Sequence, residues 1–274
     1  MTAAEVLSRH ELVLLDAYGV LVHSTGAIPH AAQFIEALQR LGKPYFVLTN
    51  DAARLPSTCA SFYASHGIHI PEDRIITAGS LLSPRLAVLH QPKVCVVGPA
   101  DSLAYAEQAG ARIVGEDEAS PLLDAVLVCN TVPDLLPAAE RALNRCFRSI
   151  DGGQVPLLLA PNPDVLFPKG DGNFGVTTGG LVALMEAALQ ARYPQLGLRF
   201  ERLGKPYAPI FEAALARSPS KDMVLFGDQL ETDVRGACDF GIASALMGTG
   251  VARIDADTPC EHACPTYRLR DLSI

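Results

Sequence analysis

The sequence predicts an α/β protein in which an open parallel sheet is interrupted by a second, inserted α/β unit. Short apolar segments alternate along the chain with stretches whose apolar residues recur at helical spacing, as is typical of parallel sheets. Polar residues end three of these apolar segments, at Asp16, Thr49 and Asp228, although the segments lie far apart in the sequence. Because ligands bind outside the carboxyl ends of the strands in such sheets, we expect the three residues to share one binding site.

The N-terminal part of the chain carries the first strands and helices of this pattern. Residues 12–16 form an apolar run that ends in a carboxylate, and residues 29–41 carry apolar side chains at helical spacing before Gly42. The alternation continues, and it predicts strands at 44–48 and 75–76 and a helix at 56–66. These elements form the first part of the expected sheet.

The alternation starts again after Pro92 and predicts a second α/β unit. Its expected strands are 93–97, 125–129 and 155–159, and its expected helices are 102–109, 137–147 and 180–192. The glycine-rich residues 170–175 follow no extended strand and open no helix, so we expect them to form a loop.

The C-terminal part returns to the first pattern, with a helix expected at 209–216 and strands at 223–226 and 243–247. Because Asp228 ends one of these strands, this part belongs with the N-terminal one. The sequence therefore predicts a core made of residues 1–81 and 200–274, with residues 82–199 inserted into it.

Composition and charge exclude several classes of function. The formal net charge of -8 and the pI near 5.3 disfavour nucleic-acid binding, which needs clustered Lys and Arg. The sequence offers no apolar stretch of membrane-spanning length. Its seven cysteines are odd in number and scattered, which disfavours a disulfide framework. We therefore expect a cytoplasmic protein that binds neither nucleic acid nor membrane.

Acidic residues gather where two of the predicted strands end. Asp228, Glu231 and Asp233 fall within six residues after one strand, and such acids repel one another unless a cation lies among them. Carboxylate oxygens are the ligands that Mg²⁺ prefers. An acidic helix N-terminus would explain Glu231 but not Asp228. Asp16 suits a nucleophile or metal ligand at the sheet edge, and equally an Asp that caps a turn.

Two further short motifs carry groups that can bind a phosphate. Thr49 and Asn50 place a hydroxyl and an amide after the second strand, and Lys205 supplies a cation in Gly-Lys-Pro. Each alone has a simpler interpretation, since Thr-Asn is common at helix starts and turns and a lone lysine is usually solvated.

Taken in order, these motifs resemble the haloacid dehalogenase superfamily of phosphohydrolases. The likeness extends over nearly the whole chain, and it is closest to the branch of p-nitrophenyl, sugar-phosphate and nucleotide phosphatases that carry an α/β cap. The matching motifs are Asp16, Thr49-Asn50, Asn162-Pro163-Asp164, Gly204-Lys205-Pro206, Gly227-Asp228 with Thr232-Asp233, and Gly241-Ile242. The resemblance implies a Rossmann-like core, a cap formed by residues 82–199, a small phosphorylated metabolite as substrate and a homodimer formed through the cap.

The resemblance also implies roles for the acidic residues and the lysine. Asp16 is expected to be the nucleophile that forms an aspartyl-phosphate. Asp16, the backbone carbonyl of Tyr18 and Asp228 are expected to hold Mg²⁺. Asp233 is expected to act on the metal through water or through Lys205.

Substrate binding is assigned by the same resemblance. Thr49, Asn50 and Lys205 are expected to bind the phosphoryl oxygens and to neutralise charge as it redistributes in the transition state. Asn162 and Asp164 are expected to face the substrate from the cap. The resemblance does not give the identity of the substrate.

Tyr18 departs from the family pattern. Phosphatases of the family carry a second aspartate two residues after the nucleophile, which protonates the leaving oxygen and later activates water, whereas this chain has Tyr18. Such a general acid/base contributes ~10²–10⁴-fold to the rate. We therefore expect altered or slow chemistry that favours aryl or acyl phosphates, unless Tyr18 or His23 donates the proton.

Two alternatives stand beside the phosphatase. A non-catalytic protein that binds a phosphorylated metabolite is the second hypothesis, because metal and phosphate binding survive the change at Tyr18. The third is a haloacid dehalogenase, since Asp-Ala-Tyr-Gly is similar to the first motif of those enzymes. Two features argue against a dehalogenase. Dehalogenases carry a helical cap between the first two motifs, whereas residues 21–49 of this chain hold only one helix and one strand. Dehalogenases also lack the metal-binding acid that this chain has at Asp228.

Overall fold

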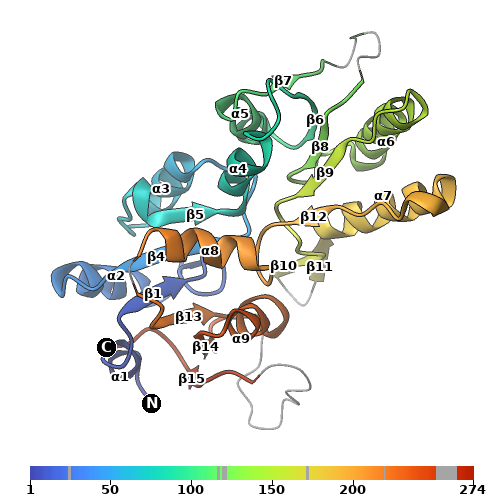
Figure 1. Ribbon diagram of the computed structural model, residues 1–274. Helices are drawn as coiled ribbons and strands as arrows, with labels where there is room; N and C mark the ends of the chain where they lie inside the picture. Colours follow the sequence, from blue (N-terminus) through green and yellow to red (C-terminus); the bar gives the residue numbers. More distant parts are fainter. Residues whose placement is uncertain (24–25, 116–117, 119–121, 171–172, 219, 251–263) are drawn as a thin grey trace. The chain divides into compact units, whose positions relative to one another are not determined.

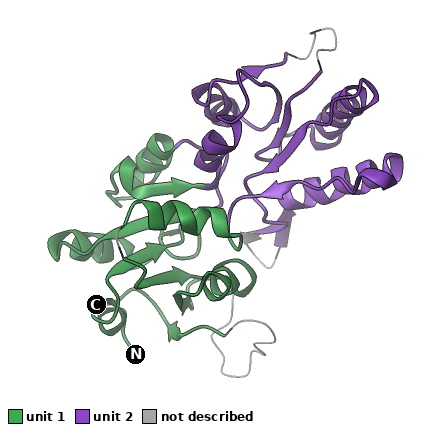
Figure 2. Cartoon of the chain, viewed as in Figure 1, with its two compact units in different colours: residues 1–49, 56–77, 205–274 green, residues 50–55, 78–204 purple. Residues whose placement is uncertain are grey.

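The computed structural model describes residues 1–23, 26–115, 118, 122–170, 173–218, 220–250 and 264–274, which fall into two compact units (Figure 2). The first unit comprises residues 1–49, 56–77 and 205–274, and the second comprises residues 50–55 and 78–204. The predicted insertion, 82–199, lies within the second unit. None of the described helices combines the length and the apolar character needed to cross a membrane.

The first unit is built on a parallel sheet, which has six strands in the described residues (Figure 1). In spatial order these are β15 (Tyr267–Leu269), β14 (Ala243–Met247), β13 (Met223–Gly227), β1 (Leu12–Leu15), β4 (Tyr45–Thr49) and β5 (Ile75–Thr77). The chain runs outward from β1 in one direction through β4 and β5, and in the other through β13, β14 and β15. β1 therefore lies at the point where the strand order reverses, which is where such sheets bind ligands.

Helices cover both faces of this sheet, so its strands β1, β4, β5 and β13 are buried along their whole length. They are α1 (Ala3–Leu7), α2 (Ala31–Arg40), α3 (Pro56–Ser65), α8 (Ala208–Ala216) and α9 (Arg235–Phe240). Val13 and Leu15 of β1 pack with Phe34 of α2 in one core, whereas the alternate residues of β1 face the other side. All four residues of β1 are buried, because a parallel sheet lies between two helical layers.

The second unit contains its own parallel sheet, with five strands in the described residues. In spatial order they are β12 (Glu201–Arg202), β9 (Leu157–Ala160), β8 (Ala125–Val128), β6 (Lys93–Val97) and β7 (Arg112–Ile113). The helices are α4 (Leu82–Leu86), α5 (Ala100–Gln108), α6 (Leu135–Asp151) and α7 (Thr178–Arg192). Apolar residues of α6 and α7 pack on β8 in a core separate from that of the first unit. The α/β character predicted for both units is confirmed.

The expectation that residues 170–175 form a loop is wrong for Gly170 and for residues 173–175, which lie in strands, whereas residues 171–172 lie outside the described residues. β10 (Leu166–Gly170) and β11 (Asn173–Val176) pair as an antiparallel hairpin, in which Phe167 lies opposite Gly175. Pro168 and the glycines hid this pattern, and Phe167 and Phe174 are exposed, so no alternation of buried residues marks the strands. A second hairpin, β2 (Val22–His23) with β3 (Gly26–Ala27), is too short for sequence periodicity to reveal.

Replacing Phe34 by alanine should lower the free energy of unfolding of the first unit by about 3–5 kcal/mol, because it leaves a cavity in the core. Phe34 is fully buried, and its ring centroid lies 5.6 Å from that of Phe226. Leu41→Ala, at a side chain that is 68% exposed, is the control and should change the value by less than about 0.5 kcal/mol. Chemical denaturation measures both, and equal losses would contradict the assignment of this core.

Candidate active site

Three buried carboxylates meet at the carboxyl ends of β1 and β13. Asp16 directly follows β1, Asp228 directly follows β13, and Asp233 lies in the π-helical turn Leu230–Val234 that comes next. One oxygen of each carboxylate lies within 4.8 Å of the others. Because β1 and β13 are adjacent and parallel, residues more than two hundred positions apart are brought together at one sheet edge. The prediction that these strand ends meet is confirmed.

Lys205 joins two of these acids. Its Nζ lies 2.6 Å from Asp16 Oδ1 and 2.7 Å from Asp233 Oδ1, and the side chain is only 2% exposed. Charge-assisted contacts of this length are strong, and an ammonium so deeply buried needs them. Lys205 is the first residue of the chain's return into the first unit. Its ion pairs therefore fix the start of that segment beside Asp16.

Asp233 organises the turn after β13 as well as the lysine. Its Oδ2 accepts hydrogen bonds from the backbone N–H groups of Asp228 and Gln229, both at 3.1 Å, while Oδ1 pairs with Lys205. Gly227 is needed beside it, since a Cβ at that position would collide with the Asp233 side chain. Gly227, Asp228 and Asp233 are therefore spaced as they are in the sequence because the Asp233 carboxylate caps the turn in which it lies.

Burial and charge shift the pKa values of this cluster in a consistent way. Burial raises the pKa of Asp16 well above its ordinary value of 3.8, by more than the attraction of Lys205 lowers it, and Asp233 and Asp228 raise it further. Burial alone would lower the pKa of Lys205, but Asp16 and Asp233 outweigh it and the pKa is raised. The lysine therefore stays charged, and Asp16 lacks enough positive charge to remain ionised easily.

The cluster fits a divalent cation. Its donors are the carboxylate oxygens of Asp16, Asp228 and Asp233, which suit hard ions such as Mg²⁺. When ionised, these acids exceed the single positive charge of Lys205 among the described residues nearby, and the added charge of a metal would correct this imbalance. Gly19 and Gly250 leave room for the Asp228 carboxylate, because a Cβ at either position would collide with it.

Thr249 belongs to the site, although sequence reasoning missed it. Its hydroxyl donates a hydrogen bond of 2.6 Å to the carbonyl of Gly19, which follows Tyr18. This contact ties the loop after β14 to the loop after β1. The same rule that identified Asp16 and Asp228 could have found Thr249, because it follows the carboxyl end of a predicted strand.

Tyr18 and Thr49 lie near the ends of neighbouring strands of the first unit. Thr49 is the buried last residue of β4, which pairs with β1. Tyr18 lies in the turn between β1 and β2, forms a bridge with Val22, and is 41% exposed. His23 lies in β2, opposite Gly26. The first unit thus contains the predicted residues Asp16, Tyr18, Thr49, Lys205, Asp228 and Asp233.

The other predicted residues form a cluster of their own in the second unit. Asn50 Nδ2 donates a hydrogen bond of 2.8 Å to Asp164 Oδ1, and the backbone N–H of Asp164 donates one of 2.9 Å to Asn162 Oδ1. Gly204 packs closely here, since a Cβ at that position would collide with the Asn50 side chain. The structure therefore brings together three residues that the sequence placed in two separate motifs.

Comparison with known proteins defines the class to which this fold and site belong. Residues 13–112 match the family model of haloacid dehalogenase-like hydrolases, and residues 202–273 match a second model, described as HAD-hydrolase-like. Chronophin of Homo sapiens is 29% identical, covering 92% of this chain and 85% of its own. Ribonucleotide monophosphatase NagD of Escherichia coli is 28% identical, covering 89% of each chain.

A solved structure shows the same architecture. The possible sugar phosphatase of the haloacid dehalogenase superfamily from Cytophaga hutchinsonii is 25% identical, with a TM-score of 0.84 over 100% of this chain and 98% of its own. The chain belongs to the haloacid dehalogenase-like hydrolases, in the phosphatase branch of that superfamily. The resemblance inferred from the motifs is confirmed.

Replacing Asp16 by asparagine should raise the free energy of unfolding by about 1–2 kcal/mol at neutral pH in metal-free buffer, because it removes a poorly compensated buried charge. The folded chain holds the Asp16 proton more tightly than the unfolded chain does. Stability is therefore lost as the pH rises from 3.8 through the raised pKa of the folded state. The rise in the free energy of unfolding caused by Asp16→Asn should therefore shrink as the pH falls toward 3.8.

Denaturation at several pH values measures this gain. Glu231→Gln is the control, since the Glu231 side chain is 79% exposed and should contribute little at any pH. A stabilisation by Asp16→Asn that does not depend on pH would contradict the account.

Proposed function

We propose that the chain is a Mg²⁺-dependent phosphohydrolase that acts on a small phosphorylated metabolite through an aspartyl-phosphate at Asp16. The observation that carries this proposal is the place of Asp16, buried at the end of the central strand, 2.6 Å from Lys205 and within 4.8 Å of Asp228 and Asp233. A carboxylate nucleophile needs such surroundings, because its target is a phosphate that carries negative charge itself.

The reaction then takes two displacements. A carboxylate oxygen of Asp16 attacks phosphorus, and the bond between phosphorus and the leaving oxygen breaks. The leaving oxygen takes up a proton from solvent, so that a phosphate ester becomes an aspartyl-phosphate and an alcohol. Water attacks the same phosphorus in the second step and releases inorganic phosphate and the Asp16 carboxylate. Asp16, Asp228 and the Tyr18 carbonyl would hold Mg²⁺, and the bound ion would supply positive charge that favours ionised Asp16 and offsets charge on the phosphoryl oxygens.

The remaining predicted residues have supporting roles in this proposal. Lys205 and Thr49 bind phosphoryl oxygens, with the ammonium held ready by Asp233. Asn50 is a third phosphoryl ligand, and its hydrogen bond to Asp164 orients its amide. Substrate binding by Asn162 and Asp164 stays a prediction of the resemblance. Dimerisation through this cap and a cytoplasmic location stay predictions.

The names of the relatives narrow the class of substrate. Two of them are a ribonucleotide monophosphatase of Escherichia coli and the sugar-phosphatase AraL of Bacillus subtilis, the latter 26% identical over 88% of this chain. Both names describe the removal of a phosphate from a small sugar-containing molecule. We therefore propose a sugar phosphate or a nucleoside monophosphate as the substrate of this chain.

Tyr18 determines which leaving groups the site handles well. A phenol is a far weaker acid than a carboxylic acid, so Tyr18 replaces the usual proton donor poorly. Leaving groups that need little protonation, such as p-nitrophenolate, should therefore react best. This change is also the observation that favours the second candidate function, a protein that binds a phosphorylated metabolite without hydrolysing it.

Replacing Tyr18 by aspartate should raise the kcat for an alkyl phosphate by ~10²–10⁴-fold, because it restores a carboxyl general acid. The increase should be much smaller for p-nitrophenyl phosphate, whose leaving group needs no proton. Tyr18→Phe is the matched control, since it keeps the ring and removes only the hydroxyl. A lower rate in Tyr18→Phe would identify the tyrosine itself as the donor, and an unchanged rate in Tyr18→Asp would contradict the proposed defect.

An assay with two substrates separates the candidate functions. p-Nitrophenyl phosphate should be hydrolysed with Mg²⁺, should not be hydrolysed once the metal is chelated, and should not be hydrolysed by Asp16→Asn. Chloride release from 2-chloropropionate without metal would instead identify a dehalogenase. No turnover of any phosphate ester, together with saturable binding of sugar phosphates in a calorimeter, would identify the binding protein.

A further inference from the structure

Two loops of the first unit meet beside the Asp228 carboxylate. One follows β1 and contains Gly19, and the other follows β14 and contains Thr249 and Gly250. Both loops approach the same acid closely, since a Cβ at Gly19 or at Gly250 would collide with the Asp228 side chain. The Thr249 hydroxyl joins them, because it donates its hydrogen bond of 2.6 Å to the Gly19 carbonyl. Thr249 therefore links two loops that border one expected metal ligand.

The peptide groups on the two sides of Gly19 each take part in a hydrogen bond. The preceding group contains the Tyr18 carbonyl and the Gly19 N–H, which donates a hydrogen bond of 2.9 Å to the carbonyl of Val22. The following group contains the Gly19 carbonyl, which accepts the hydrogen bond from Thr249. Because a peptide group is planar, the first bond restrains the direction of the Tyr18 carbonyl, and the second restrains the plane that follows Gly19.

Without these two hydrogen bonds, Gly19 would be a flexible joint in the loop after β1. Its φ is +82°, and it has no Cβ that restricts rotation. The Tyr18 carbonyl on one side of this joint is an expected ligand of Mg²⁺. Since Mg²⁺ demands near-octahedral geometry, it binds more tightly to ligands that are already held in place. Restraint of Gly19 should therefore increase the affinity of the site for the metal.

The loop that carries Thr249 is anchored on the parallel sheet. Met247, the last residue of β14, pairs with Leu269 of β15, and the N–H of Gly248 donates a hydrogen bond of 2.8 Å to the Leu269 carbonyl. The Thr249 side chain is itself half-buried. Two paired strands thus determine where the Thr249 hydroxyl lies, so it can hold Gly19 in place.

We propose that Thr249 is a positioning residue of the metal site, which raises the affinity for Mg²⁺ by restraining Gly19 and with it the Tyr18 carbonyl. In this role Thr249 contacts neither the metal nor the substrate and acts only through the backbone of the loop after β1. The proposal rests on the proposed function, in which Asp16, Asp228 and the Tyr18 carbonyl would hold Mg²⁺.

Isothermal calorimetry with Mg²⁺ on the full chain tests this role without relying on catalysis. Thr249→Val keeps the shape of the side chain and removes the hydroxyl, so the Kd for Mg²⁺ should rise about three- to tenfold, as expected for the loss of one hydrogen bond. Thr249→Ser keeps a hydroxyl and should restore most of the affinity. The Mg²⁺ concentration that gives half-maximal hydrolysis of p-nitrophenyl phosphate should rise by the same factor as the Kd.

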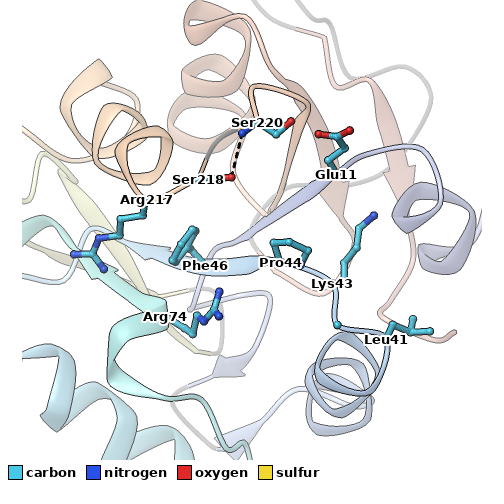
Figure 3. A pocket seen from close by; sticks show the side chains of 10 residues that line it. Glu11, Leu41, Lys43, Pro44, Phe46, Arg74, Arg217, Ser218 and Ser220 are labelled. Carbon is cyan, nitrogen blue, oxygen red and sulfur yellow. Dashed lines mark hydrogen bonds between the residues drawn. The ribbon is translucent and has the colours of Figure 1, made fainter.

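Ser220→Ala is the matched control. Ser220 Oγ accepts a hydrogen bond of 3.1 Å from the Asp222 N–H, so this variant also removes a contact between a hydroxyl and the backbone of the first unit. Ser220 lines a cavity at the amino ends of the strands, together with Glu11 and Arg74, which directly precede β1 and β5 (Figure 3). Because β13 separates Ser220 from Asp228, the Kd for Mg²⁺ should not change.

Asp228→Asn is the second control, since it removes an expected ligand. It should weaken Mg²⁺ binding far more than Thr249→Val does, which shows that the measured heat comes from this site.

Three outcomes would overturn the role of Thr249 and leave the metal site in place. They are an unchanged Kd in Thr249→Val, a loss of affinity in Thr249→Ser as large as that in Thr249→Val, and an equal loss in Ser220→Ala. The absence of Mg²⁺ binding by the wild type would instead contradict the proposed metal site, and the role of Thr249 would fall with it. The two failures are therefore distinguishable.

Discussion

The ion pairs of Lys205 with Asp16 and Asp233 are the interaction on which the candidate active site depends. Two buried carboxylates at the ends of different strands would repel each other, and the ammonium between them reduces this repulsion without removing it. Such buried pairs stabilise a fold little, because taking the charges out of water costs about as much as their attraction returns. The arrangement therefore serves function rather than stability. Its acids outnumber its single ammonium at the place where a metal and a phosphate are expected to bind.

The apolar strands of the first unit hold these charged residues in place. β1 and β13 are buried on both faces, so their backbone positions are fixed by packing rather than by the charged residues at their ends. Asp16 and Asp228 need only follow those strands to come within reach of each other. Glycines then adjust the loops, since Gly19 and Gly227 each lie where a larger residue would collide with an aspartate of the cluster. Rigid strands and small loop residues together define the geometry of the site.

Tyr18 separates two properties that usually occur together in this family. The residues that would hold metal and phosphate are all present, whereas the carboxylic acid that exchanges protons with the leaving group is replaced by a phenol. Capture of phosphate and acid catalysis depend on different atoms, so the first can persist when the second is changed.

The sequence by itself determined the α/β class, most of the strands and the motifs at their carboxyl ends, because buried parallel strands are continuous apolar runs that are easily recognised. Tertiary structure alone decided which strands are neighbours, and so placed Lys205 between Asp16 and Asp233 and joined Asn50 to Asp164. It also revealed the hairpin of β10 and β11, in which Phe167 and Phe174 are exposed, and the contact of Thr249 with Gly19. Periodicity reports what each segment buries, whereas the meeting of distant side chains depends on strand order, which no local pattern encodes.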